Sequence, residues 1–127
     1  MMVGIGIDIV EIHRNHEALE GNQALEKKVF TDEEIGYCRQ RKNKNQHFGG
    51  RFAAKEAALK ALGTGWSQGI HWKDVEIIDG EQGKPGLVFH GKAKEVFEKL
   101  GAQRIHLSIT HSSEHAVAVV VLAGEAG

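Results

Sequence analysis

Two carboxylates, Asp8 and Glu56, are the residues in this sequence best suited to bind a metal ion. Asp8 lies in the N-terminal segment GIGIDIVEI, and Glu56 lies in RFAAKEAALKALGTG, where Lys60 follows one helical turn later. Carboxylate oxygens are hard ligands, and a pair of them favours Mg²⁺ whose other positions are filled by water and phosphate oxygens. The sequence therefore predicts a Mg²⁺ site formed by Asp8 and Glu56.

Each of these residues also has a purely structural interpretation. Glu56 and Lys60 are spaced as i and i+4, which on a helix surface gives an ion pair worth only about 0.2–0.5 kcal/mol. Asp8 lies near the end of a predicted strand, where an aspartate can cap the next turn. The helix has little other polar surface, however, and a buried charge needs a partner or a metal ion.

A strand and a long helix must position these side chains. In residues 3–11, isoleucines alternate with Gly4, Gly6 and Asp8, which predicts a strand with these three residues on one face. Glycines weaken a strand unless another element approaches its backbone, so this face predicts the floor of a pocket. Residues 46–62 form the predicted helix, with one apolar stripe and many alanines that allow close approach.

The remaining patterns predict an α+β fold. Thr31 and Glu34 form a capping box at the start of a helix that runs to about residue 41. Other helical segments are predicted at residues 13–28 and 92–100, and strands at 72–78, 86–89, 104–110 and 115–122. The last strand, AVAVVVL, is apolar on both faces and should be central. Tight strand-to-strand turns favour an antiparallel sheet packed on the long helix.

The composition is that of an ordinary globular chain. Of its 127 residues 41% are hydrophobic and 26% charged, and the formal net charge is −1. This balance gives no support for nucleic-acid binding or for a basic membrane anchor. The N-terminus lacks the features of a signal peptide, and no run approaches the roughly 18 apolar residues of a membrane span. With Cys38 as the single cysteine, we expect a cytoplasmic protein in which residues 1–127 form one domain.

Three other segments carry polar residues of interest. HLSITHS places His106 on the polar face of a predicted strand, and His111 and His115 follow it. This spacing matches no zinc motif, so a polar strand face lining a ligand groove is the favoured interpretation. The connector RQRKNKNQ is either a solvated loop or a phosphate-binding segment. GKP, residues 83–85, has the composition of a turn.

Five segments occur in an order that resembles the holo-[acyl-carrier-protein] synthases, the short trimeric 4′-phosphopantetheinyl transferases. They are GIGIDIVEI, FTDEEIGYC, RFAAKEAALKALGTG, GKP and HLSITHS, within residues 3–122. The resemblance implies the fold of that family and transfer of 4′-phosphopantetheine from coenzyme A to a serine of apo acyl carrier protein. It also implies a Mg²⁺ cofactor, a role in fatty acid biosynthesis, and a homotrimer with active sites between subunits.

The resemblance assigns roles to individual residues. It implies that Asp8 and Glu56 hold Mg²⁺ and that Glu56, or a water beside it on the metal, takes the serine proton. Lys60 then stabilises or protonates the leaving phosphate, so that Glu56 and Lys60 form a catalytic pair. Arg14 in the first helix is the expected contact for the acidic carrier protein. The expected coenzyme A contacts are Lys42, Lys44, Arg51, Lys60, Gly63, Lys84, Pro85, His106 and His111.

Two other classes of function remain open. A metal-dependent phosphoesterase would use Asp8 and Glu56 to hydrolyse coenzyme A and would need no carrier protein. A coenzyme-A-binding or carrier-binding module would keep Glu56 and Lys60 only as a structural bridge. The preferred carrier protein is not specified by the sequence.

Overall fold

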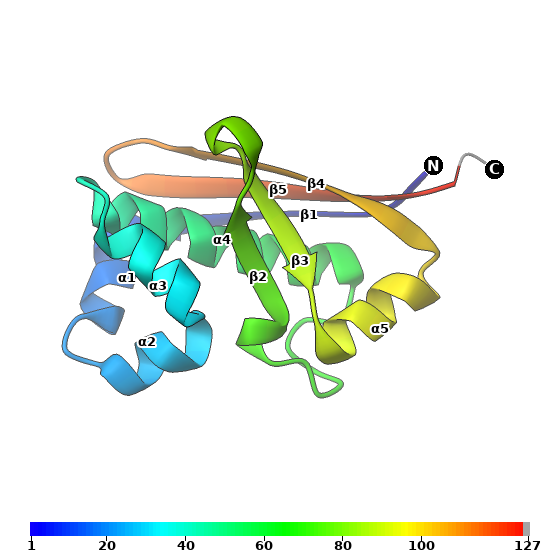
Figure 1. Cartoon of the computed structure of the whole chain (residues 1–127), viewed down its shortest axis with the longest axis horizontal. Coiled ribbons are helices and arrows are strands. Elements are labelled where there is room, and N and C mark those ends of the chain that lie inside the picture. Colours follow the sequence, from blue (N-terminus) through cyan, green and yellow to red (C-terminus); the bar gives the residue numbers. More distant parts are fainter. Residues whose placement is uncertain (126–127) are drawn as a thin grey trace.

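A three-stranded antiparallel sheet and the long helix α4 form the centre of the computed structural model, which describes residues 1–125 (Figure 1). The helices are α1 (Ile12–Leu19), α2 (Gln23–Val29), α3 (Asp32–Arg39), α4 (Lys44–Leu62) and α5 (Gly91–Lys99). The strands are β1 (Met2–Glu11), β2 (Val75–Asp79), β3 (Pro85–Phe89), β4 (Ala102–His111) and β5 (His115–Gly124). This architecture confirms the predicted α+β fold with an antiparallel sheet on a long helix.

The large sheet has the strand order β1-β5-β4, and β2 and β3 form a separate hairpin. The central place of β5 confirms the prediction for AVAVVVL, because a central strand covered on one face and flanked on both sides can be apolar throughout. In this register Val119 lies between Ile7 of β1 and Ser108 of β4. β1 and β4 are thus the two opposite edges of the sheet.

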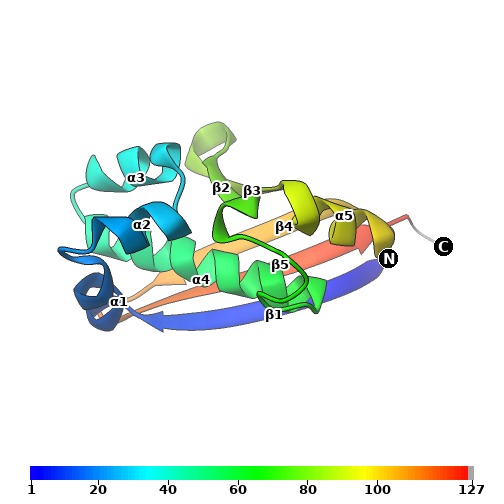
Figure 2. The same cartoon turned by 90° about the horizontal axis from the view of Figure 1, so that it is seen from below.

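Helix α4 lies directly against β1 and β5, and the glycines of β1 make this contact possible. A Cβ atom at Gly4 would overlap the carbonyl oxygen of Ala61, and one at Gly6 would overlap that of Ala57. The strand face that carries Gly4, Gly6 and Asp8 therefore faces the helix. The alternation correctly placed these residues on one face, but at Gly4 and Gly6 the helix backbone occupies the space where the sequence predicted the floor of a pocket. In Figures 1 and 2 the five helices lie on this side of the long strands.

The other face of the sheet is uncovered, and its β1 and β5 parts are apolar, whereas β4 contributes His106, Ser108 and Thr110 to it. Ile5, Ile7 and Ile9 of β1 are 57%, 60% and 63% exposed. Val117, Val119 and Val121 lie beside them on β5. Such a contiguous apolar face on a folded chain marks an interaction surface.

The helical segment predicted at residues 13–28 is divided into α1 and α2, and α3 ends at Arg39 rather than at about residue 41. α1 and α2 are separated at Gly21, which has a φ of +69°, and the Asn22 side chain caps α2 by accepting from the Leu25 N–H. Thr31 and Glu34 form the capping box of α3, with distances of 3.1 and 2.7 Å. In the described part of the chain, no helix is both long and apolar enough to cross a membrane.

The strand predicted at residues 72–78 starts later, at Val75. Residues Trp72–Asp74 instead form a 3-10 turn, in which the Asp74 carboxylate accepts the His71 N–H at 2.9 Å. The buried ammonium of Lys55 also donates hydrogen bonds to the carbonyl oxygens of Trp72 and Val75. These hydrogen bonds hold residues 72–74 in a turn, so their backbone groups do not pair in a strand. The β-rich composition of the segment did not reveal this turn.

Candidate active site

The structure brings Asp8, Glu56 and Lys60 together between β1 and α4. Lys60 Nζ lies 3.0 Å from Asp8 Oδ1 and 3.0 Å from the carbonyl oxygen of Ile7. Within residues 1–125, Lys60 forms no ion pair with Glu56. The i,i+4 surface bridge considered from the sequence is therefore replaced by a contact from the helix to the strand. Both partners are accessible, with side-chain exposures of 54% for Lys60 and 18% for Asp8.

Glu56 is half-buried on the same side of α4. The indole N–H of Trp66 donates to its Oε1 at 3.3 Å. Burial is the main cause that raises the pKa of Glu56, and the negative charge of Asp8 raises it further, whereas the Trp66 hydrogen bond and Lys60 lower it. Burial and the second carboxylate both disfavour a charged Glu56, and a bound cation would relieve that cost.

The donor set around this cluster suits a hard divalent cation. Asp8 already pairs with one cation, the ammonium of Lys60. Glu56 adds a second carboxylate, which is close enough to Asp8 for the charge of Asp8 to raise its pKa. Two carboxylates, with water and substrate oxygens, are a common Mg²⁺ environment in phosphate-handling sites. No group of three or more histidine, cysteine or carboxylate side chains gathers as metal ligands among the described residues. The alternative zinc site at His106, His111 and His115 is thus not assembled in this part of the chain.

A second set of predicted residues meets in a pocket of about 160 Å³ between α3, α4, β4 and the β2–β3 hairpin. Arg51, Pro85 and His111 all line it. Arg51 is 4% exposed, and its Nε has no hydrogen-bond partner within residues 1–125. A buried guanidinium with an unused donor beside a cavity is suited to bind an anion.

Tyr37 forms one wall of this pocket, and the sequence analysis did not single it out. The guanidinium carbons of Arg51 and Arg41 lie 3.8 and 4.0 Å from the centroid of its ring. Stacking on an aromatic face holds such groups in fixed orientations. The spacing of residues in FTDEEIGYC does not predict a role for Tyr37, because its partners Arg51 and Arg41 come from α4 and from the connector before it.

The two sets of predicted residues lie at opposite edges of the sheet. Asp8 belongs to β1, whereas His111 belongs to β4, and β5 separates these strands. Gly63 ends α4 near the first set, in a left-handed conformation with a φ of 81°. His106 points away from both, because it shares the uncovered face with its partner Val121. Lys42 and Lys84 are exposed at the connector and at the hairpin.

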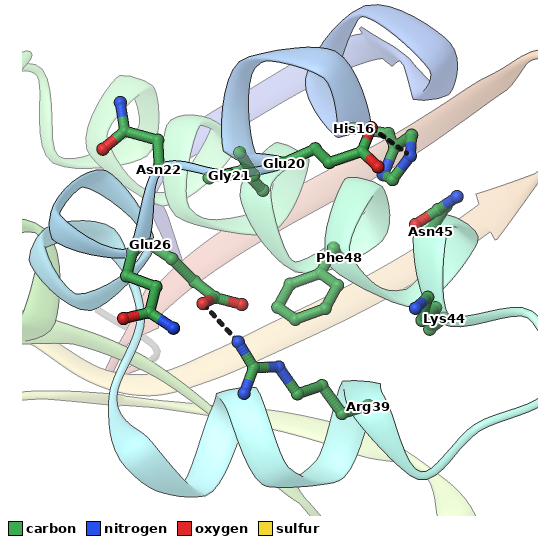
Figure 3. Close-up of a pocket in the computed structure, with 11 residues that line it drawn as sticks. His16, Glu20, Gly21, Asn22, Glu26, Arg39, Lys44, Asn45 and Phe48 are labelled. Carbon is green, nitrogen blue, oxygen red and sulfur yellow. Dashed lines mark hydrogen bonds and ion pairs between the residues drawn. The ribbon is translucent and has the colours of Figure 1, made fainter.

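Lys44 lines a further pocket, of about 260 Å³, which lies between α1, α2, α3 and the start of α4 (Figure 3). Arg39 donates to the nearly buried Glu26 at 2.6 Å across this pocket, and Phe48 forms part of its floor. Arg39 and Glu26 neutralise each other here, so the exposed Lys44 is the cation of this pocket that forms no ion pair within residues 1–125.

A buried ion pair lies elsewhere on α4, one residue before Glu56. Lys55 Nζ is 3.0 Å from Glu34 Oε1, and both side chains are 0% exposed. Burial lowers the pKa of Lys55, and the Glu34 charge opposes that shift. The sequence identified Glu34 as a member of the capping box but did not identify Lys55 as its partner.

Comparisons with known proteins agree with this geometry. Residues 4–120 match the family model described as the 4′-phosphopantetheinyl transferase superfamily. A holo-[acyl-carrier-protein] synthase of Geobacter sp. (strain M21) is 48% identical over 123 residues, which cover 96% of this chain and 98% of that protein.

Two solved structures are similar over almost the whole chain. One is a holo-(acyl-carrier-protein) synthase from Bacillus anthracis in complex with CoA (3′,5′-ADP), with a TM-score of 0.80, 36% identity, and coverage of 98% and 99%. The other is the Helicobacter pylori enzyme in complex with coenzyme A, with a TM-score of 0.81, 30% identity, and coverage of 94% and 99%. By its sequence, its fold and the convergence of Asp8, Glu56 and Lys60, this chain belongs to the holo-[acyl-carrier-protein] synthases of the 4′-phosphopantetheinyl transferase superfamily.

Proposed function

We propose that this protein transfers the 4′-phosphopantetheine group of coenzyme A to a serine of apo acyl carrier protein. The observation that carries the proposal is the cluster of Asp8, Glu56 and Lys60 in a chain of this family. The serine Oγ forms a bond to the phosphorus that carries pantetheine, and the bond from this phosphorus to the bridging pyrophosphate oxygen breaks. Adenosine 3′,5′-bisphosphate leaves, and the holo carrier protein serves fatty acid biosynthesis.

Asp8 and Glu56 are the residues that hold Mg²⁺ in this proposal. When bound, the ion neutralises charge on the pyrophosphate, which is the main requirement of phosphoryl transfer. Glu56, or a water beside it on the metal, is the proposed acceptor of the serine proton. Burial raises the pKa of Glu56 in the metal-free protein, and a bound cation would lower it again.

Lys60 is the group that stabilises the leaving phosphate. Its ammonium is half-exposed and held by only two contacts, to Asp8 Oδ1 and to the Ile7 carbonyl oxygen. Such a cation can turn from these oxygens to a phosphate oxygen at little cost in stability. It neutralises, or protonates, the oxygen that separates from the transferred phosphorus.

The pocket around Arg51 is the proposed site for the nucleotide end of coenzyme A. The unpartnered Nε of Arg51 suits a phosphate, and stacking on Tyr37 holds this guanidinium in a fixed orientation. Lys42 and Lys44 are the proposed contacts for the 3′-phosphate. The other proposed coenzyme A contacts are Gly63, Lys84, Pro85, His106 and His111.

The separation of these two sets supports a homotrimer with shared sites. One coenzyme A molecule could contact both sets if the β1 edge of one subunit met the β4 edge of the next, and such head-to-tail contacts close into rings. The uncovered face with Ile5, Ile7 and Ile9 supplies apolar surface for such contacts. Light scattering should give about three times the mass of one 127-residue chain. A monomer with full activity would contradict the shared site.

The acidic carrier protein is proposed to dock on α1, through Arg14. This side chain is exposed and makes only a long contact of 4.0 Å to Glu11. Arg14→Glu should raise the Michaelis constant for the carrier and leave that for coenzyme A unchanged, with a smaller effect at high salt. Lys99→Glu, at an exposed cation on α5, is the matched control.

One incubation tests the proposed reaction. The protein is mixed with coenzyme A, Mg²⁺ and apo acyl carrier protein, and the products are weighed by mass spectrometry. Transfer adds one phosphopantetheine to the carrier. Release of adenosine bisphosphate with an unmodified carrier would indicate a hydrolase, and no product of either kind would indicate a binding module.

A further inference from the structure

We infer that Trp66 is a positioning residue for Glu56, holding its carboxylate in one orientation beside Asp8 through the indole N–H. This inference rests on the proposed function, in which Glu56 is a Mg²⁺ ligand and proton acceptor. Trp66 Nε1 donates to Glu56 Oε1 at 3.3 Å. Within residues 1–125 the second oxygen, Oε2, accepts no hydrogen bond, which leaves it available for a ligand.

The loop after α4 is shaped so that Trp66 turns back to the helix. Gly63 and Gly65 have φ values of 81° and 59°, which glycine adopts without strain. The Ser67 hydroxyl donates to the carbonyl oxygen of Thr64 at 2.6 Å and closes the turn. The chain therefore reverses direction immediately after α4, and the indole reaches a residue ten positions earlier.

A ladder of three aromatic rings fixes the indole from behind. The Trp66 and Trp72 rings have centroids 3.6 Å apart, and Trp72 is stacked on Phe52 at 5.3 Å with an interplanar angle of 28°. Phe52 lies on α4, one turn before Glu56. The Trp66 indole is therefore held to α4 at two points: through Trp72 to Phe52, and through its own N–H to Glu56. Its position is thus fixed relative to the helix that carries its hydrogen-bond acceptor.

The ladder is anchored at its middle by the buried ion pair. Lys55 Nζ donates to the carbonyl oxygen of Trp72 at 3.2 Å, and Glu34 holds this ammonium at 3.0 Å. Trp72 therefore has a fixed backbone as well as a stacked side chain. A carboxylate on a flexible glutamate side chain gains a defined orientation only from such a chain of rigid contacts.

Trp66→Phe tests the inference, because it keeps an aromatic ring beside Trp72 but removes the N–H donor together with part of the indole ring area. Trp72→Phe is the matched control, since it loses the same ring area but no hydrogen bond to Glu56. Loss of a hydrogen bond to a metal-ligating group typically costs about 10–100-fold in metal affinity or activity. We expect that loss in Mg²⁺ affinity, measured by calorimetry, and in kcat for Trp66→Phe, and a clearly smaller loss for Trp72→Phe, which keeps the hydrogen bond and shortens the ladder. The KM for coenzyme A and the Tm should be nearly unchanged.

A readout independent of activity is the Trp66 indole N–H resonance in ¹H–¹⁵N NMR spectra. It should move when Glu56 is replaced in Glu56→Gln and when Mg²⁺ is added to the wild type. Equal Mg²⁺ affinity and kcat in Trp66→Phe and the wild type would overturn the inference. A wild type that binds Mg²⁺ but transfers nothing would refute the proposed function, and the calorimetric comparison would still decide the role of Trp66. A wild type with no Mg²⁺ affinity would overturn both.

Discussion

Lys55 and Lys60 lie five residues apart on the same helix, and each pairs with a carboxylate at 3.0 Å. Lys55 and its partner Glu34 are 0% exposed, whereas the Lys60 side chain is 54% exposed. The partner of Lys55 also accepts two backbone N–H groups, from Thr31 and Ile77. Lys60 reaches Asp8 at the surface, and the nearby Glu56 forms no ion pair within residues 1–125.

The difference between these lysines shows how one helix can carry one ion pair that stabilises the fold and another that is available for the reaction. A buried pair cannot exchange partners, because an uncompensated charge in the interior costs several kcal/mol. An exposed pair contributes little to stability and can be rearranged by substrate or metal. The same helix α4 can thus be held rigidly by Lys55 and present a movable cation at Lys60.

Lys55→Met should have the largest effect. It leaves the Glu34 carboxylate buried without a cation, which should lower the free energy of unfolding by about 3–5 kcal/mol. The measurement is urea unfolding followed by circular dichroism. Adding Glu34→Gln to the same chain should recover part of the loss, because the unpaired charge is then gone. A loss under about 1 kcal/mol for Lys55→Met alone would show that this pair is not structural.

Asp8→Asn and Glu56→Gln should each lower turnover by about 100-fold or more, with folding intact. Both changes keep the side-chain shape and remove one charge from the proposed Mg²⁺ site. The double variant should lose little beyond either single one, because both residues serve one ion. Steady-state transfer assays with and without chelator measure this. Near-normal turnover in either single variant would refute the metal site.

Lys60→Met is the direct counterpart of Lys55→Met. The free energy of unfolding should change by at most about 1 kcal/mol, since the pair with Asp8 is exposed. Turnover should nevertheless fall by about 10–100-fold, because Lys60 contacts a proposed metal ligand. Parallel unfolding and transfer measurements on the two lysine variants test the contrast. Equal losses of stability in Lys55→Met and Lys60→Met would contradict the proposed difference between the two lysines.

The smallest expected effect is a pH dependence of stability at Glu56. Burial raises the pKa of Glu56 above its usual 4.5 in the folded state, so the folded protein favours the protonated form. In metal-free buffer this contribution is complete below pH 4.5 and is lost as pH rises through the raised pKa. Glu56→Gln should flatten this part of the urea-unfolding profile. An unchanged profile would mean that Glu56 is not desolvated.

Sequence patterns alone determined the fold class and which residues of β1 share one face. Alternation in GIGIDIVEI puts Gly4, Gly6 and Asp8 on one side, and the apolar AVAVVVL segment puts β5 in the centre. These features follow from periods of two and 3.6 residues, which are visible in a linear sequence. The motifs that carry the family resemblance also selected Asp8, Glu56 and Lys60.

Only the tertiary structure decided which partner each charge has. The sequence suggested Glu56 as the neighbour of Lys60, but the strand lies close enough for Asp8 to take the ammonium at 3.0 Å. The contacts of Trp66 with Glu56, of Glu34 with Lys55 and of Arg51 with Tyr37 were not predicted, because each joins residues at least ten positions apart. Local propensity specifies how a segment folds. Contacts between distant residues depend instead on how loops close and how helices pack, which no short sequence pattern encodes.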